Sequence, residues 1–169
     1  MTNMKKLASV ILLASLSLIY FSSCQPKVDI EKDKEAIKTV FEKEKEAFFN
    51  QDLAGMGETW VNEPTSVKIY ISADGQNKYE GWDNITAQSQ KEISDTTWDW
   101  KQIKVSILNY KINVMDKSAW VLCDYHWEGT IRGEAMTLDQ SRICVLKKVD
   151  NKWKFALMAM YAIPQKQSK

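Results

Sequence analysis

The stretch that decides the fold runs from Ala119 to Ala162 and reads AWVLCDYHWEGTIRGEAMTLDQSRICVLKKVDNKWKFALMAMYA. It contains three runs rich in apolar residues, separated by the turn signals Gly133-Glu134 and Asp150-Asn151. Glycine at the first position of a two-residue loop, and an Asp-Asn pair, both suit the tight turns that join antiparallel strands. We therefore predict a meander of antiparallel strands over residues 119–132, 135–148 and 153–162.

The turns also predict which side chains share a face of the meander. If each turn is a two-residue loop, Arg132 faces Ala135 and Val149 faces Lys152. Alternate residues then point to the same side, and one face is mostly apolar and should pack inward. A slip of one residue in either hairpin would exchange the two faces of one strand. The inward residues are expected to be Val121, Cys123, Tyr125, Trp127, Ile131, Met136, Leu138, Gln140, Arg142, Cys144, Leu146, Trp153, Phe155, Leu157, Ala159 and Tyr161.

The opposite face of the meander is expected to be polar at one end and apolar elsewhere. Its polar end carries Asp124, His126 and Glu128, and its apolar part carries Trp120, Leu122, Val145, Met158 and Met160. A sheet that is apolar on both sides needs a second cover. We therefore expect a homodimer that forms through this outer face.

Helices are predicted before the meander. Asp29 can cap a first helix, whose apolar residues recur every three to four positions as far as Phe48. After a break at 50–52, a short second helix ends near Trp60. A strand over Val67–Ser72, a turn at 73–76, a third helix over Trp82–Ile93 and strands over 98–107 and 110–115 follow. Helices that precede an antiparallel meander indicate an α+β fold.

This order of elements resembles the nuclear transport factor 2-like superfamily. The likeness also includes Trp60, Gly81-Trp82 at the start of the third helix, and the closing residues Asp150 to Phe155, over residues 29–163 in all. Within the superfamily the chain is most similar to the SnoaL-like and ketosteroid-isomerase-like branch. The resemblance implies a cone-shaped, curved antiparallel sheet wrapped around an N-terminal helix plus two shorter helices, with a pocket at the wide end. Members include isomerases, cyclases, dehydratases and binding modules, so the fold does not choose an activity.

The inward face brings a guanidinium group among aromatic rings. The proposed register makes Tyr125 and Arg142 direct cross-strand neighbours. An arginine in such a pocket can bind a carboxylate through its planar fork of donors. The alternative is a structural arginine satisfied by groups of the fold, and the aromatic residues of the helical side can equally fill the core. The expected ligand-binding residues are Arg142, Tyr125, Gln140, Trp127 and Tyr161, joined from the helical side by Trp60 and Tyr70.

The remaining reactive side chains predict little chemistry. The same register places Cys123 opposite Cys144, so a disulfide is possible outside the cytoplasm, although two free buried thiols are the alternative. His126, the lone histidine, has Ser141 opposite and Asp124 nearby, but a flat sheet face offers no oxyanion hole. The inward face contains no Asp or Glu that could act as a general base. Because metal-ligand spacings, cofactor motifs and basic stripes are absent, we expect no metal, cofactor or nucleic acid.

The first 24 residues resemble a bacterial lipoprotein signal. Lys5 and Lys6 precede an apolar block over 7–21, which at about 15 residues is shorter than the ~20 of a membrane-spanning helix. Ser22, Ser23 and Cys24 follow. We predict a signal peptide at 1–23, lipidation of Cys24, a tether at 24–28, one domain at 29–163 and a tail at 164–169. Such a protein is anchored in the cell envelope outside the cytoplasm, in the periplasm or at the outer membrane.

These observations predict a lipid-anchored binding module rather than an enzyme. Its pocket is expected to bind a small, partly apolar molecule, either anionic or neutral, through contacts with Arg142, Tyr125 and Gln140. Two alternatives stay open: an isomerase, cyclase or dehydratase that uses a carboxylate or His126 as base, and a protein-interaction module of the envelope. A titratable base inside the pocket distinguishes the enzyme from the binding module.

Overall fold

The computed structural model describes residues 29–131 and 133–163. The predicted signal peptide, the lipidation site Cys24, the tether and the tail lie outside these residues and stay predictions. Within the described ranges, no helix is both long enough and apolar enough to cross a membrane.

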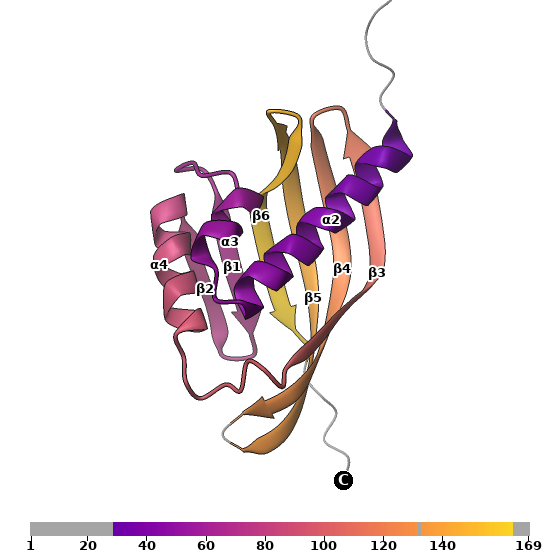
Figure 1. The fold of residues 1–169 in the computed structure, drawn as a ribbon. Helices are drawn as coiled ribbons and strands as arrows, with labels where there is room; N and C mark the ends of the chain where they lie inside the picture. The colour runs from indigo at the N-terminus through magenta and orange to yellow at the C-terminus, as the bar shows by residue number, and fades with distance from the viewer. Residues whose placement is uncertain (1–28, 132, 164–169) are drawn as a thin grey trace, which may run out of the picture.

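The described chain forms three helices and one six-stranded sheet. The sheet has the order β2-β1-β6-β5-β4-β3. Figure 1 shows α2 crossing one face of the curved sheet diagonally, with α3 and α4 on the side of β1 and β2. This arrangement confirms the predicted α+β cone. The elements are α2 (Ile30–Phe49), α3 (Leu53–Thr59), β1 (Val67–Ser72), β2 (Gly75–Glu80), α4 (Trp82–Ile93), β3 (Lys104–Met115), β4 (Ser118–Ile131), β5 (Glu134–Val149) and β6 (Lys152–Ala162).

The sheet differs from the prediction at its edges. It is mixed, because β1 runs parallel to its neighbour β6. Residues 75–80, expected to follow a turn without a strand of their own, form β2 and pair with β1. The strands predicted over 98–107 and 110–115 are one strand, β3, interrupted by an irregularity between Leu108 and Lys111 where Asn109 has φ 55°. Residues 98–103 belong instead to the segment that joins α4 to β3.

The β4–β5 hairpin is shifted by two residues from the predicted register. Ile131 faces Glu134, so Tyr125 faces Gln140 and Cys123 faces Arg142. A shift of two keeps every side chain on its predicted face, because the side-chain period of a strand is two. Arg142 and Tyr125 are accordingly buried on the inner face, although they are not directly opposed as expected.

A bulge in the last hairpin reverses half of β6. Val149 faces Lys152 as predicted, but Leu146 faces Phe155 whereas Val145 faces Leu157, so Ala156 is an extra residue. An extra residue exchanges the faces of everything beyond it. Met158 and Met160 therefore point inward and are buried, whereas Tyr161 is 45% exposed. The inward placement of Tyr161, Leu157 and Ala159 was wrong for this reason.

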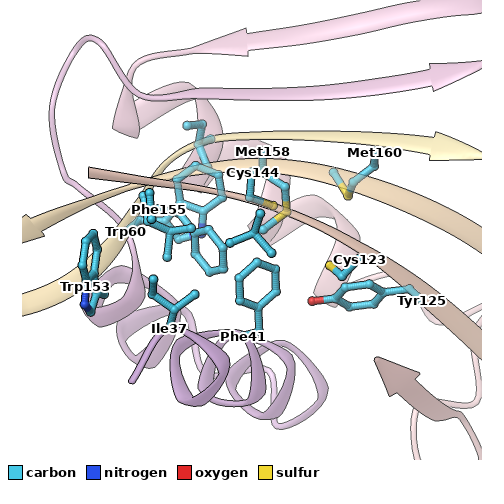
Figure 2. Packing of buried hydrophobic residues seen from close by; sticks show 14 of the residues in the cluster. Ile37, Phe41, Trp60, Cys123, Tyr125, Cys144, Trp153, Phe155, Met158 and Met160 are labelled. Carbon is cyan, nitrogen blue, oxygen red and sulfur yellow. The ribbon is translucent and has the colours of Figure 1, made fainter. Parts of the chain in front are cut away.

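The core lies between α2 and the inner face of the sheet. Figure 2 shows Phe41 and Ile37 of α2 directed toward the residues of the sheet. The ring of Phe41 packs edge-on against Phe155, with 4.8 Å between centroids, and against Tyr110 at 5.5 Å. Trp60 is fully buried beside Phe155 at 5.6 Å. Such aromatic pairs stabilise the packing beyond the effect of area alone.

Cys123 and Cys144 are free buried thiols, so the possible disulfide is not formed. The cause is the two-residue shift in β4–β5, which places Cys123 opposite Arg142 and Cys144 opposite Val121. Burial raises the pKa of the Cys123 thiol to about 12. Both thiols are therefore protonated at neutral pH and are poor nucleophiles.

Candidate functional site

A cavity of about 210 Å³ lies between the C-terminal half of α2 and the inner face of the sheet. The segment between α4 and β3 borders it as well. Seven of its sixteen described lining residues are aromatic, and charged groups come from both the helices and the strands. Its lining residues are Glu44, Lys45, Phe48, Phe49, Lys68, Tyr70, Glu92, Asp95, Trp98, Trp100, Val105, Tyr125, Trp127, Gln140, Arg142 and Met160.

Arg142 supplies the buried cation of the cavity, since only 5% of the residue is exposed. Its guanidinium carbon lies 3.4 Å from the centroid of the Tyr125 ring. One terminal nitrogen donates to Gln140 Oε1 at 3.3 Å, and the other contacts the sulfur of Met158 at 3.6 Å. Throughout residues 29–131 and 133–163, no carboxylate lies within ion-pair distance of this guanidinium.

Three hydrogen-bonding atoms around this cation lack a protein partner in the described part of the chain. They are Arg142 Nε, Tyr125 Oη and Trp127 Nε1. Burial raises the pKa of Tyr125, so its hydroxyl keeps its proton and can donate. Burial alone would lower the pKa of Arg142, but Tyr125 and Glu44 nearby raise it above its ordinary value. None of these three atoms has appreciable accessible surface, so what Arg142 offers to the cavity is its positive charge.

Three acidic residues of the described chain reach the cavity, Glu44 and Glu92 from helices and Asp95 from the segment after α4, and none comes from a strand. Glu92 of α4 is paired, because it accepts from Lys68 Nζ at 3.1 Å and from Gln88 Nε2 at 2.9 Å. Lys68 is itself buried, at 3% exposure, and its Nζ also lies 3.3 Å from Ser89 Oγ. The expectation that no acid faces the inside holds for the meander but not for the cavity as a whole.

Glu44 of α2 differs from Glu92 because its carboxyl group has no hydrogen bond or ion pair with another described residue. The residue is only 5% exposed and lines the cavity. Its signal in the sequence is its position three residues after Phe41 and four before Phe48, on the apolar side of the helix. Sequence reasoning missed it because charged residues dominate this helix.

Indole and phenyl rings close the cavity on the side of the α4–β3 segment. Trp98 and Trp100 stack with 5.3 Å between centroids and 9° between their planes. Trp100 packs edge-on against Phe48 at 5.3 Å, and Phe49 lies 5.6 Å from Trp127. Trp100 Nε1 donates to the carbonyl oxygen of Asp95 at 3.1 Å, which ties the segment back toward α4. A flat apolar group fits between such walls.

The structure brings together most of the predicted ligand-binding residues. Arg142, Tyr125, Gln140, Trp127 and Tyr70 line the cavity. Trp60 lies instead in the core, packed against Phe155 and Trp82. Tyr161 lies on the outer face because of the bulge at Ala156. Met160 occupies the inward place that was predicted for Tyr161.

His126 lies on the outer face of the sheet, within a polar cluster. Its Nδ1 is 2.6 Å from Asp139 Oδ1, and its Nε2 is 3.4 Å from Glu128 Oε1. Hydrogen bonds that the His126 ring donates to these two carboxylates raise the pKa of His126. Ser141 donates to Asp124 at 2.7 Å rather than facing His126, so these groups do not form a nucleophile–base pair.

A strongly curved sheet that packs on three helices and encloses an aromatic cavity defines a protein of the nuclear transport factor 2-like superfamily. Residues 37–159 match the SnoaL-like domain family, and the chain belongs to that family. No curated protein matches the sequence.

Solved structures of the superfamily are similar to this chain in fold at low sequence identity. A superfamily protein from Salmonella enterica aligns with a TM-score of 0.66 and 15% identity, over 82% of this chain and 96% of its own. A protein from Streptomyces avermitilis, provisionally assigned as a dehydratase, gives 0.66 and 12%, over 80% and 99%. A ketosteroid isomerase-like protein from Erwinia carotovora gives 0.57 and 13%, over 78% and 96%.

Proposed function

We propose that this protein binds a small, partly apolar molecule that carries a carboxylate or a similar anionic group. The observation that carries the proposal is the buried guanidinium of Arg142, which faces the cavity without a carboxylate partner in the described chain. A buried charge is costly unless it is paired and hydrogen-bonded. A ligand carboxylate would pair with this charge.

The size and wall of the cavity limit the rest of the ligand. Its volume of about 210 Å³ is below the ~300–1,000 Å³ of sites for drug-sized molecules. The stacked indoles of Trp98 and Trp100 and the ring of Phe49 favour a flat apolar body. The proposed ligand is therefore about the size of a single ring with short substituents.

Isothermal titration calorimetry with 4-methylbenzoate and its neutral analogue 4-methylbenzamide tests this proposal. We expect the unaltered protein to bind the acid at least about tenfold more tightly than the amide, a difference of about 1.4 kcal/mol. The Arg142→Met variant should lose this preference. Lys147→Met removes an exposed cation from the same strand and serves as the control. Equal binding of acid and amide by the unaltered protein would exclude the proposed role of Arg142.

A second function, catalysis of proton transfer in the same cavity, is favoured by Glu44. A buried carboxyl group without a protein partner is suited to act as a general base. The relative from Streptomyces avermitilis that is provisionally assigned as a dehydratase makes such chemistry a reasonable alternative. We propose binding first because Arg142 acts on any anionic ligand, whether or not it reacts.

Exchange of the C3 protons of phenylpyruvate in deuterated water tests the enzymatic alternative. Proton NMR should show faster exchange with the unaltered protein than with buffer alone if Glu44 is a base. Glu44→Gln should then remove the acceleration while calorimetry still detects binding of phenylpyruvate. The same exchange rate with and without protein would leave binding as the function of the cavity.

We propose further that the protein is a lipid-anchored homodimer of the cell envelope. The apolar side chains of the outer sheet face support a second copy there: Ile143 is 54% exposed, Tyr161 45% and Trp120 39%. Light scattering should give twice the mass of the chain, and Ile143→Asp should halve the measured mass. A monomer at high concentration contradicts the proposed dimer.

The lipid anchor is tested separately. Cys24→Ala should release the protein from the membrane fraction of cells that express it. A Cys24→Ala protein that stays in the membrane fraction contradicts the proposed anchor.

A further inference from the structure

Glu44 points to a second polar group on the ligand. We propose that the ligand carries a hydrogen-bond donor, a hydroxyl or an ammonium group, that binds the Glu44 carboxyl while its anionic group binds Arg142. The expected class is a small aromatic acid with a donor substituent. This inference rests on the proposed binding function and adds the part of the ligand that Arg142 does not recognise.

The first step is the contrast between two acids of one cavity. Lys68 and Gln88 already satisfy the carboxylate of Glu92. Glu44 is buried whereas Glu92 is half-buried, and Glu44 has no donor from the described residues within hydrogen-bond distance. Its carboxyl oxygens are not among the side-chain atoms of the described chain that lack both accessible surface and a partner, so they can be reached from the cavity. A ligand donor in the cavity would give Glu44 the hydrogen bond that no described residue supplies.

The second step concerns the complementary pattern at the other polar groups. Arg142 is a buried cation that lines the cavity without a carboxylate within ion-pair distance among the described residues. The unpartnered carboxyl of Glu44 offers acceptor oxygens instead. A ligand that satisfies both needs an anionic acceptor group and a donor group on one body. Both residues line the same cavity of about 210 Å³, so a single small molecule can reach both.

The third step is the nature of the body between the two polar groups. Phe48 lies one turn beyond Glu44 on α2 and packs against Trp100. Tyr125 stacks on the guanidinium of Arg142. Aromatic side chains thus lie beside each of the two polar groups, which favours a ring that carries both substituents.

Calorimetry with matched pairs of acids tests the inference. The hydroxyl pair is 3- or 4-hydroxybenzoate against the methylbenzoate with the same substitution, since a methyl group replaces the hydroxyl at nearly equal size. The ammonium arm uses 3- or 4-(aminomethyl)benzoate against the corresponding ethylbenzoate. We expect at least one donor-bearing acid to bind about tenfold more tightly than its apolar partner. The arm that shows the preference identifies the donor as hydroxyl or ammonium.

The variants assign the preference to Glu44. Glu44→Met keeps the length of the side chain without its acceptor atoms, and it should reduce the preference to about onefold while the methylbenzoates still bind. Glu46→Met removes an exposed acid of the same helix and should leave the preference unchanged. Circular dichroism melting curves verify that each variant is folded.

The outcomes separate this inference from the proposed function. If the methylbenzoates bind through Arg142 but no donor-bearing acid binds more tightly, the inference is wrong and the proposed function stands. A preference that persists in Glu44→Met also overturns the inference. If no acid binds at all, both the proposed function and the inference fail.

Discussion

Replacing Arg142 by methionine should leave the stability of the unliganded protein almost unchanged. Loss of a structural arginine would instead destabilise the protein, because partners would be left unsatisfied. The guanidinium is buried, has no carboxylate partner among the described residues and keeps one nitrogen without an acceptor. Methionine has a similar length and places no charge beside Met158 and the Tyr125 ring. The stability of this variant therefore separates the binding role of Arg142 from the structural role.

The magnitude follows from the contacts of the guanidinium. The variant loses the stacking on Tyr125, worth about 2 kcal/mol when desolvated. It also loses the hydrogen bond to Gln140, worth about 1.5 kcal/mol. It is relieved of a desolvation cost of several kcal/mol for one buried ion and of about 1–3 kcal/mol for the unpaired Nε–H. It also loses the attraction of Glu44, which with Tyr125 raises the pKa of Arg142 above its ordinary value despite burial. These contributions nearly cancel, so we expect the free energy of unfolding to change by less than about 1 kcal/mol.

Urea unfolding at pH 7, followed by circular dichroism, measures this difference. At roughly 3–4 °C for each kcal/mol, the melting temperature should change by less than about 4 °C. Lys147→Met, which removes an exposed cation from β5, should change the free energy of unfolding by less than about 0.5 kcal/mol. A loss of more than about 1 kcal/mol in Arg142→Met would refute the reasoning, because groups of the fold would then need the guanidinium.

Four further predictions concern other parts of the molecule. Asp33 accepts from Lys148 and Trp153, and these bonds bring its pKa below 3.8 although burial raises it. The stabilisation by the ionised carboxylate should be complete above about pH 4 and lost as the pH falls further. The urea midpoints at pH 7 and pH 3 should therefore differ less in Asp33→Asn than in the unaltered protein. The lone histidine should titrate above 6.5 by NMR, and Asp139→Asn should lower its pKa. Ellman's reagent should react with Cys123 and Cys144 only in the unfolded protein, since burial raises their pKa values. Phe41→Ala should cost about 3–5 kcal/mol by urea unfolding, because the ring is fully buried against Phe155 and Tyr110.

The strands of the meander could be predicted because their turns and alternation are local signals. The β4–β5 hairpin slipped by two residues, yet Arg142 and Tyr125 still faced inward, because an even shift preserves the face. The same reasoning failed for Tyr161. The bulge at Ala156 depends on how β6 packs between β1 and β5, and no turn residue marks it.

The acids of the cavity were harder to predict than the cation. Glu92 and Glu44 come from helices that lie far from β5 in the sequence, so only the tertiary fold brings them to Arg142. The helical spacing of Glu44 with Phe41 and Phe48 was available as a signal. Asp33, four residues before Ile37, gave the same signal and is also buried. Acidic residues on the apolar side of an otherwise charged helix therefore merit attention as candidates for buried roles.

The extra residue in β6 has a consequence for how new binding properties can arise in this fold. Upstream of Ala156 the odd-numbered residues of the strand face inward, and downstream the even-numbered ones do. Deleting that one alanine would leave a regular strand in which Leu157 follows Phe155 and Met160 still faces inward. Loss of the bulge with Ala156 retained would instead exchange Met160 for Tyr161 at the cavity wall without altering any codon of the strand. A thioether surface would then become a phenol surface, so the chemistry of this wall can change through strand pairing as well as through substitution.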